Sequence, residues 1–212
     1  MTVGLSSQLL EGWLSARSMA RGVPAPVRDR GGWRINTASA VERCRYVFLE
    51  ADAAFGAAAH AIDTPRVFLK ACAPAGDILA IVPQRWRLQS VAWMMLQDPP
   101  IDDPVPQLPP GYALDVTANG GVLSAVILDA DGMLAASGYG SSSGDVFCYD
   151  RIVTQPTQYR RGLGRAIICA LGRHAGAGTR RILAATAAGR ALYETLGWQV
   201  VAPYRTIEIA QP

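Results

Sequence analysis

The sequence predicts an α/β protein of the α+β kind. Helices flank a mixed, mostly antiparallel central sheet, and an additional α/β region lies at the N-terminus. Three observations support this. The chain has 212 residues, 50% of them hydrophobic, so it buries a sizeable core. Its second half shows four strand-like stretches and then alternating helices and strands, an order typical of a mixed sheet with helices packed on it. A proline-rich segment separates this regular half from the first.

The first half begins with a predicted amphipathic helix from Ser6 to Arg21. Its leucine and tryptophan residues recur at helical spacing, and Gly22 followed by two nearby prolines ends the pattern. A second, alanine-rich helix is expected from Asp52 to Ala61. Short β-prone stretches surround it at Trp33–Asn36, Tyr46–Leu49, Val67–Ala71 and Ile78–Val82.

Four strands open the second half, and the Asp131-Gly132 pair favours a tight hairpin between the middle two. The strands cover Tyr112–Thr117, Val122–Leu128, Met133–Tyr139 and Val146–Thr154. A helix with apolar residues at helical spacing is predicted next, at Gly162–Ala175. A strand, a second helix and a last strand follow at Arg181–Ala185, Gly189–Leu196 and about Tyr204–Ile209.

Six prolines in the fifteen residues 97–111 exclude a helix or a central strand there. We therefore divide the chain into an N-terminal region (1–96), a proline-rich linker (97–111) and a C-terminal domain (112–212). Such a linker has extended backbone, so it is either a semi-rigid spacer or a strap across the surface. The apolar run Trp93–Leu96 just before it either packs in the core or borders an acceptor pocket.

Composition narrows the class of protein. Twenty basic and 17 acidic residues leave a net charge of +3, far from the concentrated basicity of nucleic-acid binders, so no nucleic-acid partner is expected. The four cysteines lack the CxxC spacing or neighbouring histidine of a metal site and are expected to be reduced thiols. No apolar stretch reaches 18 residues and no signal-peptide pattern opens the chain, so we expect a cytoplasmic protein that binds no membrane.

The chemically informative stretch runs from Ile152 to Ala166, where a predicted strand leads through a glycine-bearing turn into a helix. The first N–H groups of a helix have no partner within it and carry partial positive charge, so they bind a diphosphate well. Gly162 and Gly164 let that backbone approach a ligand closely. Three basic side chains would add charge-assisted contacts: Arg160, Arg161 and Arg165. Taken alone, a Gly-x-Gly at a helix start fits a plain structural turn equally well.

Two motifs follow each other about thirty residues apart. Residues 159–164 read Tyr-Arg-Arg-Gly-Leu-Gly, and residues 193–198 read Tyr-Glu-Thr-Leu-Gly-Trp. Together they resemble the GNAT superfamily of acyl-CoA-dependent N-acyltransferases. Its pyrophosphate loop has the form Gln/Arg-x-x-Gly-x-Gly/Ala, and a later helix ends in Tyr-x-x-Leu-Gly-Phe/Trp. Tyr159 departs from the loop's first position, so one side-chain contact is in doubt, while the main-chain cradle is kept. The resemblance covers residues 112–209.

The resemblance implies acetyl-CoA as co-substrate, with no metal. The cofactor would be held by the backbone of a strand that splays from its neighbour and by the turn after it, which together comprise Ile152, Val153, Thr154, Tyr159, Arg160, Arg161, Gly162, Leu163, Gly164, Arg165 and Ala166. Tyr193 takes the place of the family's general acid. A phenol with a pKa of about 10 is protonated at neutral pH, as that role requires. The alternative is an aromatic anchor between helix and sheet.

The amine acceptor needs a base, because an ammonium group has no lone pair for attack. Asp150 is the candidate, since it precedes Ile152 and Thr154 by two and four residues on one predicted strand and is expected to face the same side. The structural alternative is that Asp150 pairs with Arg151 or another arginine.

Only residues 118–121 separate the first two strands of the second half, where GNAT proteins usually have two helices that wall the acceptor site. We expect residues 1–96 to form that wall, either as a degenerate second copy of the fold that binds no cofactor or as a replacement domain.

Three functions stay open. The first is N-acetyl transfer from acetyl-CoA to a primary amine of a small molecule or peptide by direct attack. The second is non-catalytic acyl-CoA binding or sensing, and the third is anion or nucleic-acid binding at the arginine-bearing turn. The acceptor, the base, the acyl-chain length and the oligomeric state are not fixed, and a homodimer is one option.

Overall fold

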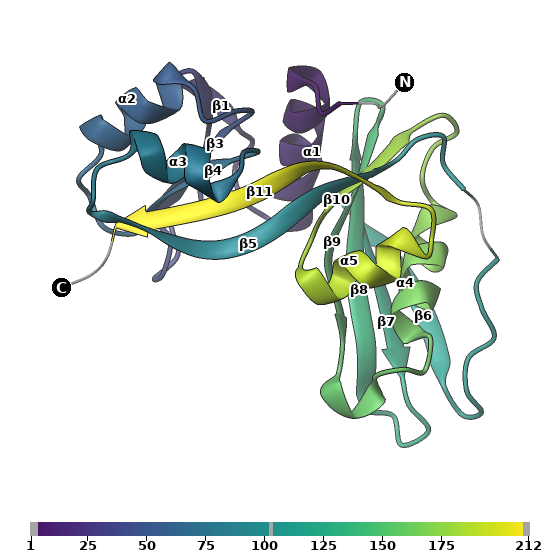
Figure 1. Cartoon of the computed structure of the whole chain (residues 1–212). Coiled ribbons are helices and arrows are strands. Elements are labelled where there is room, and N and C mark those ends of the chain that lie inside the picture. Colours follow the sequence, from purple (N-terminus) through teal and green to yellow (C-terminus); the bar gives the residue numbers. More distant parts are fainter. Residues whose placement is uncertain (1–3, 102–103, 210–212) are drawn as a thin grey trace.

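The computed structural model describes residues 4–101 and 104–209 of the chain. It has two lobes (Figure 1). The N-terminal lobe and the helix before it comprise α1 (Ser7–Ala20), β1 (Val27–Asp29), β2 (Gly32–Asn36), β3 (Cys44–Phe48), α2 (Ala53–Ala61), β4 (Val67–Ala71), α3 (Ala75–Ile81) and β5 (Trp86–Gln97). The C-terminal lobe comprises β6 (Ala113–Asn119), β7 (Val122–Leu128), β8 (Leu134–Ser143), β9 (Val146–Thr154), the 3₁₀ turn η1 (Pro156–Gln158), α4 (Leu163–Gly172), β10 (Arg180–Ala185), α5 (Ala187–Glu194) and β11 (Gln199–Ile209).

The described strands form one eleven-stranded sheet in the order β1-β2-β3-β4-β11-β5-β10-β9-β8-β7-β6. The pairs β3/β4 and β9/β10 are parallel and the other pairs are antiparallel. The predicted fold class, a mixed and mostly antiparallel sheet flanked by helices, is therefore confirmed.

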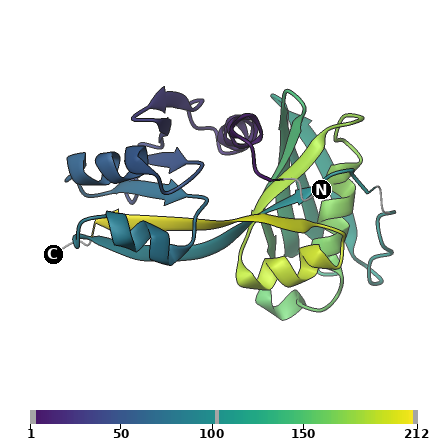
Figure 2. The same ribbon diagram turned by 45° about the horizontal axis from the view of Figure 1, so that its top comes forward.

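Helix α1 lies between the two lobes (Figure 2). It begins where the Ser6 side chain accepts a hydrogen bond from the Leu9 N–H at 3.2 Å, and it ends before Gly22, whose φ is 62°. Its apolar face, including Leu10 and Trp13 at 0% exposure, packs on β8 and β9 and contacts strands of the N-terminal lobe. The apolar spacing that predicted this helix is thus the spacing of its buried face.

The stretch Ile78–Val82 was expected to be β-prone and is instead part of α3, so that expectation is wrong. Four or five consecutive apolar residues do not distinguish a strand from a short helix. In α3 one residue, Ile78, is fully buried against α2 and β4, while Leu79 is 47% exposed. Pro74 stands at the helix start, where its missing N–H costs no hydrogen bond.

The two lobes exchange their last strands. Strand β5 follows the N-terminal lobe in sequence but lies between β10 and β11, and β11 in turn lies between β4 and β5. The two long strands pair antiparallel from Trp86↔Ile209 to Leu96↔Gln199. In Figure 1 they run side by side from one lobe to the other. The apolar run Trp93–Leu96 is the end of β5, where Met94 and Met95 are fully buried, so core packing is its role.

Both lobes have the same order of elements. The series β2, β3, α2, β4, α3, β5 corresponds to β8, β9, α4, β10, α5, β11, and in each the strand before the first helix is parallel to the strand after it. Each series also accepts the other's last strand at the equivalent place, beside β4 or β10. The molecule therefore has an internal two-fold topological repeat.

The proline-rich segment packs along the C-terminal lobe. Val105 and Leu108 pack against its apolar core, and the carbonyl of Ile101 accepts a hydrogen bond from buried Arg181 at 2.9 Å. Of the two forms expected for this segment, a strap fits these contacts better than a free spacer. None of the helices in the described ranges is long and apolar enough to cross a membrane.

Candidate functional site

Strands β9 and β10 separate in the middle of the sheet. Their parallel pairing ends at Cys148↔Ile182, although β9 continues to Thr154 and β10 to Ala185. Beyond that point β10 pairs with β5 on its other side, and β9 pairs with β8. The facing backbones of the two strands are therefore open to a third, extended group. In the N-terminal lobe the equivalent pair, β3 and β4, stays in register along the whole of both strands.

A bulge in β9 lies where the strands separate. Arg151 has a φ of 51°, and the register with β8 shifts between Ser137 and Tyr139. Before the bulge Asp150 contacts α1, whereas after it Ile152 packs with the core under α4. Asp150 therefore faces away from Ile152. The expected common face was wrong because the alternation of a regular strand fails at a bulge.

The turn after β9 leads into α4 with left-handed residues. Arg160 has a φ of 64° and Gly162, the N-cap residue, a φ of 76°. No side chain among residues 4–101 and 104–209 caps this helix. Its first N–H groups are therefore available to a ligand, as the sequence predicted for a phosphate-binding turn.

Gly164 has little space around its α-carbon. A Cβ atom there would lie 3.1 Å from Cδ2 of Leu192 in α5 and 3.7 Å from Oγ1 of Thr154. The start of α4, the end of β9 and α5 therefore meet at this point. A side chain larger than hydrogen would occupy the space above the helix start.

The other predicted binding residues lie around this turn. Val153 and Tyr159 are 50% and 60% exposed, whereas Leu163 and Ala166 lie on the buried face of α4. Arg160 and Arg165 are exposed. Arg161 donates a hydrogen bond to the hydroxyl of Tyr112, the residue just before β6, at 3.2 Å.

Tyr193 lies in α5 and is 7% exposed. Its ring packs on Trp198, with 6.0 Å between the centroids, and Trp198 packs edge-on against Tyr149 of β9. This row of rings connects Tyr193 to the first residue of β9 beyond the last β10 pair. Burial raises the pKa of Tyr193 to about 12, so its phenol keeps its proton at neutral pH. Anchoring the helix and donating a proton are both compatible with this position.

Asp150 is 6% exposed and lies among arginines. Its carboxylate accepts hydrogen bonds from Arg17 at 3.1 Å, from Arg21 at 2.7 and 2.9 Å and from Arg151 at 3.2 Å. Burial alone would raise the pKa of Asp150, but the charges of Arg17 and Arg21 outweigh it and hold that pKa below its usual value. Such a carboxylate is a weak base. The structural alternative for Asp150, pairing with arginines, is what these contacts favour.

The arginines of α1 were missed by sequence reasoning. Arg17 and Arg21 follow Trp13 at intervals of four and so lie along one side of the predicted helix. Arg17 lies over the Trp13 ring, with its guanidinium carbon 5.1 Å from the ring centroid. The four-residue spacing was the sequence feature that could have drawn attention to these arginines, although it does not identify Asp150 as their partner.

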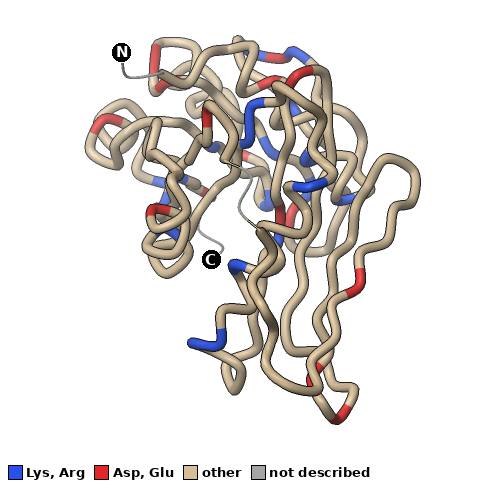
Figure 3. The backbone as a smooth tube through the Cα atoms, turned by 90° about the vertical axis from the view of Figure 1, so that its right-hand side faces the viewer, with Lys and Arg blue, Asp and Glu red and all other residues tan. Residues whose placement is uncertain are grey.

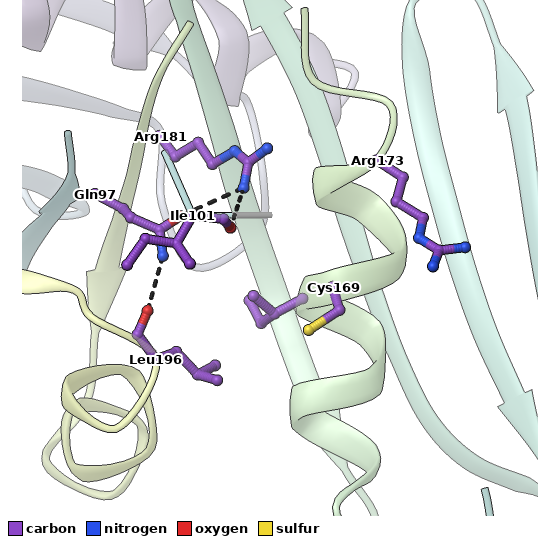
Figure 4. A pocket seen from close by; sticks show the side chains of 7 residues that line it. Gln97, Ile101, Cys169, Arg173, Arg181 and Leu196 are labelled. Carbon is purple, nitrogen blue, oxygen red and sulfur yellow. Dashed lines mark hydrogen bonds between the residues drawn. The ribbon is translucent and has the colours of Figure 1, made fainter. Parts of the chain in front are cut away.

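A small cavity lies at the other end of α4 (Figure 4), where Arg181, Gln97 and Ile101 converge. Gln97 donates a hydrogen bond to the Leu196 carbonyl at 2.8 Å, and Arg181 donates one to the Gly172 carbonyl at 3.0 Å. These bonds connect the strap and β5 to the C-terminal lobe, so we interpret this region as structural.

The separated parallel strands, the bulge and the uncapped helix start can be compared with known structures. A GCN5-related N-acetyltransferase from Kribbella flavida superposes with a TM-score of 0.67 at 16% identity, covering 99% of this chain and 97% of that one. The chain has the GNAT fold. Another GCN5-related N-acetyltransferase, from Sphaerobacter thermophilus, gives a TM-score of 0.60 at 12% identity over 85% of this chain and 78% of its own.

A tandem GNAT protein from the clavulanic acid biosynthesis pathway gives a TM-score of 0.53 at 15% identity, covering 76% of this chain and 70% of that one. No protein-family model and no curated protein sequence matches the chain. The resemblance seen in the two motifs is therefore confirmed at the level of the fold, which extends over both lobes.

Proposed function

We propose that the chain is an acyl-CoA-dependent N-acetyltransferase that uses acetyl-CoA and acts on a primary amine of a small molecule or peptide. The observation that carries this proposal is the opening between β9 and β10, next to an uncapped helix start where a Cβ at Gly164 would lie tightly against Leu192. The GNAT fold suggests the same activity.

The residues present fit acetyl-CoA. Main-chain N–H groups from Gly162 to Arg165 would hold the diphosphate, whereas the Ala166 N–H donates to the Gly162 carbonyl at 3.0 Å. The open backbone of Ile152 to Thr154 would pair with the extended arm. Arg160 and Arg165 are exposed beside the turn and would add charge to it. When bound, acetyl-CoA supplies an activated acetyl thioester.

Tyr193 would act as the general acid. Its phenol, protonated at neutral pH, would donate the Oη proton to the departing thiolate sulfur. The attacking amine must be neutral to react. Because Asp150 faces α1 and is held by arginines, we propose that it anchors α1 to β9 rather than taking the amine's proton.

We also propose that the two lobes are two copies of one fold and that the N-terminal copy binds no cofactor. The repeated element order and exchanged strands support the first part, and the closed β3/β4 pair supports the second. A neighbouring structure is itself described as a tandem GNAT protein. In this arrangement α1 and the N-terminal lobe would provide the acceptor wall.

The second candidate function is binding or sensing of acyl-CoA without transfer. The burial of Tyr193, 7% exposed within the core of the C-terminal lobe, favours an anchoring role and hence this alternative. The two functions differ in one observable: only a transferase releases free CoA thiol when amines are added.

Calorimetric titration with acetyl-CoA and CoA tests the cofactor site. We expect micromolar binding that is lost in Gly164→Leu, because the new side chain would fill the space above the helix start. Gly76→Leu is the matched control, since Gly76 is an exposed helical glycine with nothing within 4 Å of its Cβ position. Unchanged affinity in Gly164→Leu would refute the turn assignment. Thiol release with a panel of amines then separates transfer from binding.

A further inference from the structure

A cationic cavity lies beside α1 on the face of the sheet opposite α4. Its empty space of about 220 Å³ includes open solvent and only a small part of it is enclosed, so a ligand there would stay partly exposed. Figure 3 shows where the basic and acidic positions lie along the backbone. The lining residues come from α1 and the N-terminal lobe and are Leu14, Arg17, Ser18, Arg21, Val23, Ile35 and Arg45.

Positive charge exceeds negative charge around this cavity. Arg17 and Arg21 share the single carboxylate of Asp150, which also pairs with Arg151. Arg45 pairs with Glu42 in a close contact. Two carboxylates therefore face four guanidinium groups, three of which line the cavity.

Lys70 adds a further positive charge nearby. Its Nζ donates a hydrogen bond to the Thr206 hydroxyl at 3.1 Å, and no carboxylate of the described residues forms an ion pair with it. Burial, together with the nearby charges of Arg45 and Arg17, lowers the pKa of Lys70 to about 7. At neutral pH Lys70 is therefore charged in only part of the molecules, and an anion bound nearby would favour its charged form.

The cavity adjoins the opening between β9 and β10. Asp150, which Arg17 and Arg21 hold, lies two residues beyond Cys148, the last β9 residue that pairs with β10. The helix start that would hold the diphosphate is on the other face, with α4. A group bound in the cavity would therefore approach the opening from the side opposite the cofactor.

Resting on the proposed transferase function, we infer that this cavity binds a compact anionic group, a carboxylate or a phosphate, carried by the amine acceptor. Guanidinium groups match both oxyanions with paired hydrogen bonds. The acceptor's amine would then point toward the opening while its anionic group lies between α1 and β3.

Titration calorimetry of the full chain at pH 7 and constant ionic strength tests the cavity. The probes are glutarate, inorganic phosphate and neutral glutaramide, each with and without saturating acetyl-CoA. We expect at least one anion, but not the amide, to bind in both conditions, and its affinity to fall about tenfold or more in Arg45→Gln. The single variant leaves Glu42 without its partner and could therefore misfold. The double variant Glu42→Gln/Arg45→Gln removes both charges of this pair and should lose anion binding in the same way. Arg28→Gln, on an exposed pair with Glu11, is the matched control and should bind like the wild type.

Release of CoA thiol with matched pairs of acceptors tests whether the cavity recognises the anionic group of the acceptor. The pairs are β-alanine against its amide and phosphoethanolamine against ethanolamine, which also distinguishes carboxylate from phosphate. We expect kcat/KM to favour an anionic member and that preference to shrink in Arg45→Gln. Acetyl-CoA binding without anion binding, or equal use of charged and neutral amines, would overturn this inference and leave the transferase proposal intact. Failure to bind acetyl-CoA would refute the transferase proposal itself.

Discussion

Nε of Arg21 in α1 lies 2.7 Å from Oδ2 of Asp150 in β9, across 129 positions of sequence. A second arginine of α1, Arg17, binds the other oxygen of the same carboxylate. This contact fixes the first helix of the chain to the strand beside the opening. It joins the N-terminal part of the molecule to the site formed by the C-terminal lobe.

Asp150→Asn should lower the free energy of unfolding by about 3 kcal/mol, because it leaves the partly buried guanidinium groups of Arg17 and Arg21 without their carboxylate. Urea unfolding at pH 7 measures this change. Asp145→Asn is the control: Asp145 is 56% exposed and pairs with Arg180 at the surface, so its loss should cost less than about 1 kcal/mol. Full stability with lost activity would instead support Asp150 as the base.

The Asp150 contact should also make stability depend on acid pH. Because the pKa of Asp150 is lower in the folded chain than in the unfolded one, its contribution is complete above the unfolded value of about 4. This contribution to stability is lost as the pH falls through the pKa that Asp150 has in the folded chain. The stability difference between wild type and Asp150→Asn should therefore narrow from pH 5 to pH 2, as measured by urea unfolding. A difference that stays constant over this range would contradict the lowered pKa.

Tyr193→Phe should lower kcat by about ten- to a thousandfold and leave acetyl-CoA affinity nearly unchanged, because only the proton donor is removed. The ring and its packing on Trp198 remain. Tyr204→Phe is a matched control: Tyr204 is also buried, with a pKa raised to about 12 by burial, but it lies in the core next to α1. Equal turnover of Tyr193→Phe and wild type would leave Tyr193 as an anchor only.

Lys70→Met should change how stability varies at alkaline pH. Since the folded chain lowers the pKa of Lys70 to about 7, the unfolded chain binds more protons between pH 7 and about 10. Wild-type stability therefore rises over this window relative to Lys70→Met. Thermal unfolding of both proteins from pH 7 to 9.5 measures the difference. Parallel curves would show that Lys70 keeps its ordinary pKa.

Most of the secondary structure could be predicted from local pattern. The strands Val122–Leu128 and Val146–Thr154 were located to the residue, because turns with glycine or aspartate bound them. Strand β5 was not predicted: its end, Trp93–Leu96, was identified only as an apolar run, and Arg87–Val91 carries mixed polar residues on an exposed stretch. The exchange of β5 and β11 could not be predicted, because strand order depends on pairing between distant segments.

The candidate site was predictable in part. The turn at Gly162 and Gly164 was located because glycine is required by the left-handed backbone at one position and by close packing at the other. The orientation of Asp150 was missed, since a bulge at an arginine has no clear signal in sequence. The arginines of α1 were missed because their partner lies in the other half of the chain.

The exchanged strands also determine when the protein can fold during synthesis. β11 (Gln199–Ile209) is synthesised after the other described strands, yet it lies between β4 and β5 of the N-terminal lobe. Until it arrives, β4 and β5 each present an unpaired edge to the cell. We therefore expect the N-terminal lobe to be complete only after β11 has been synthesised, so that its own strands are not enough to finish its sheet.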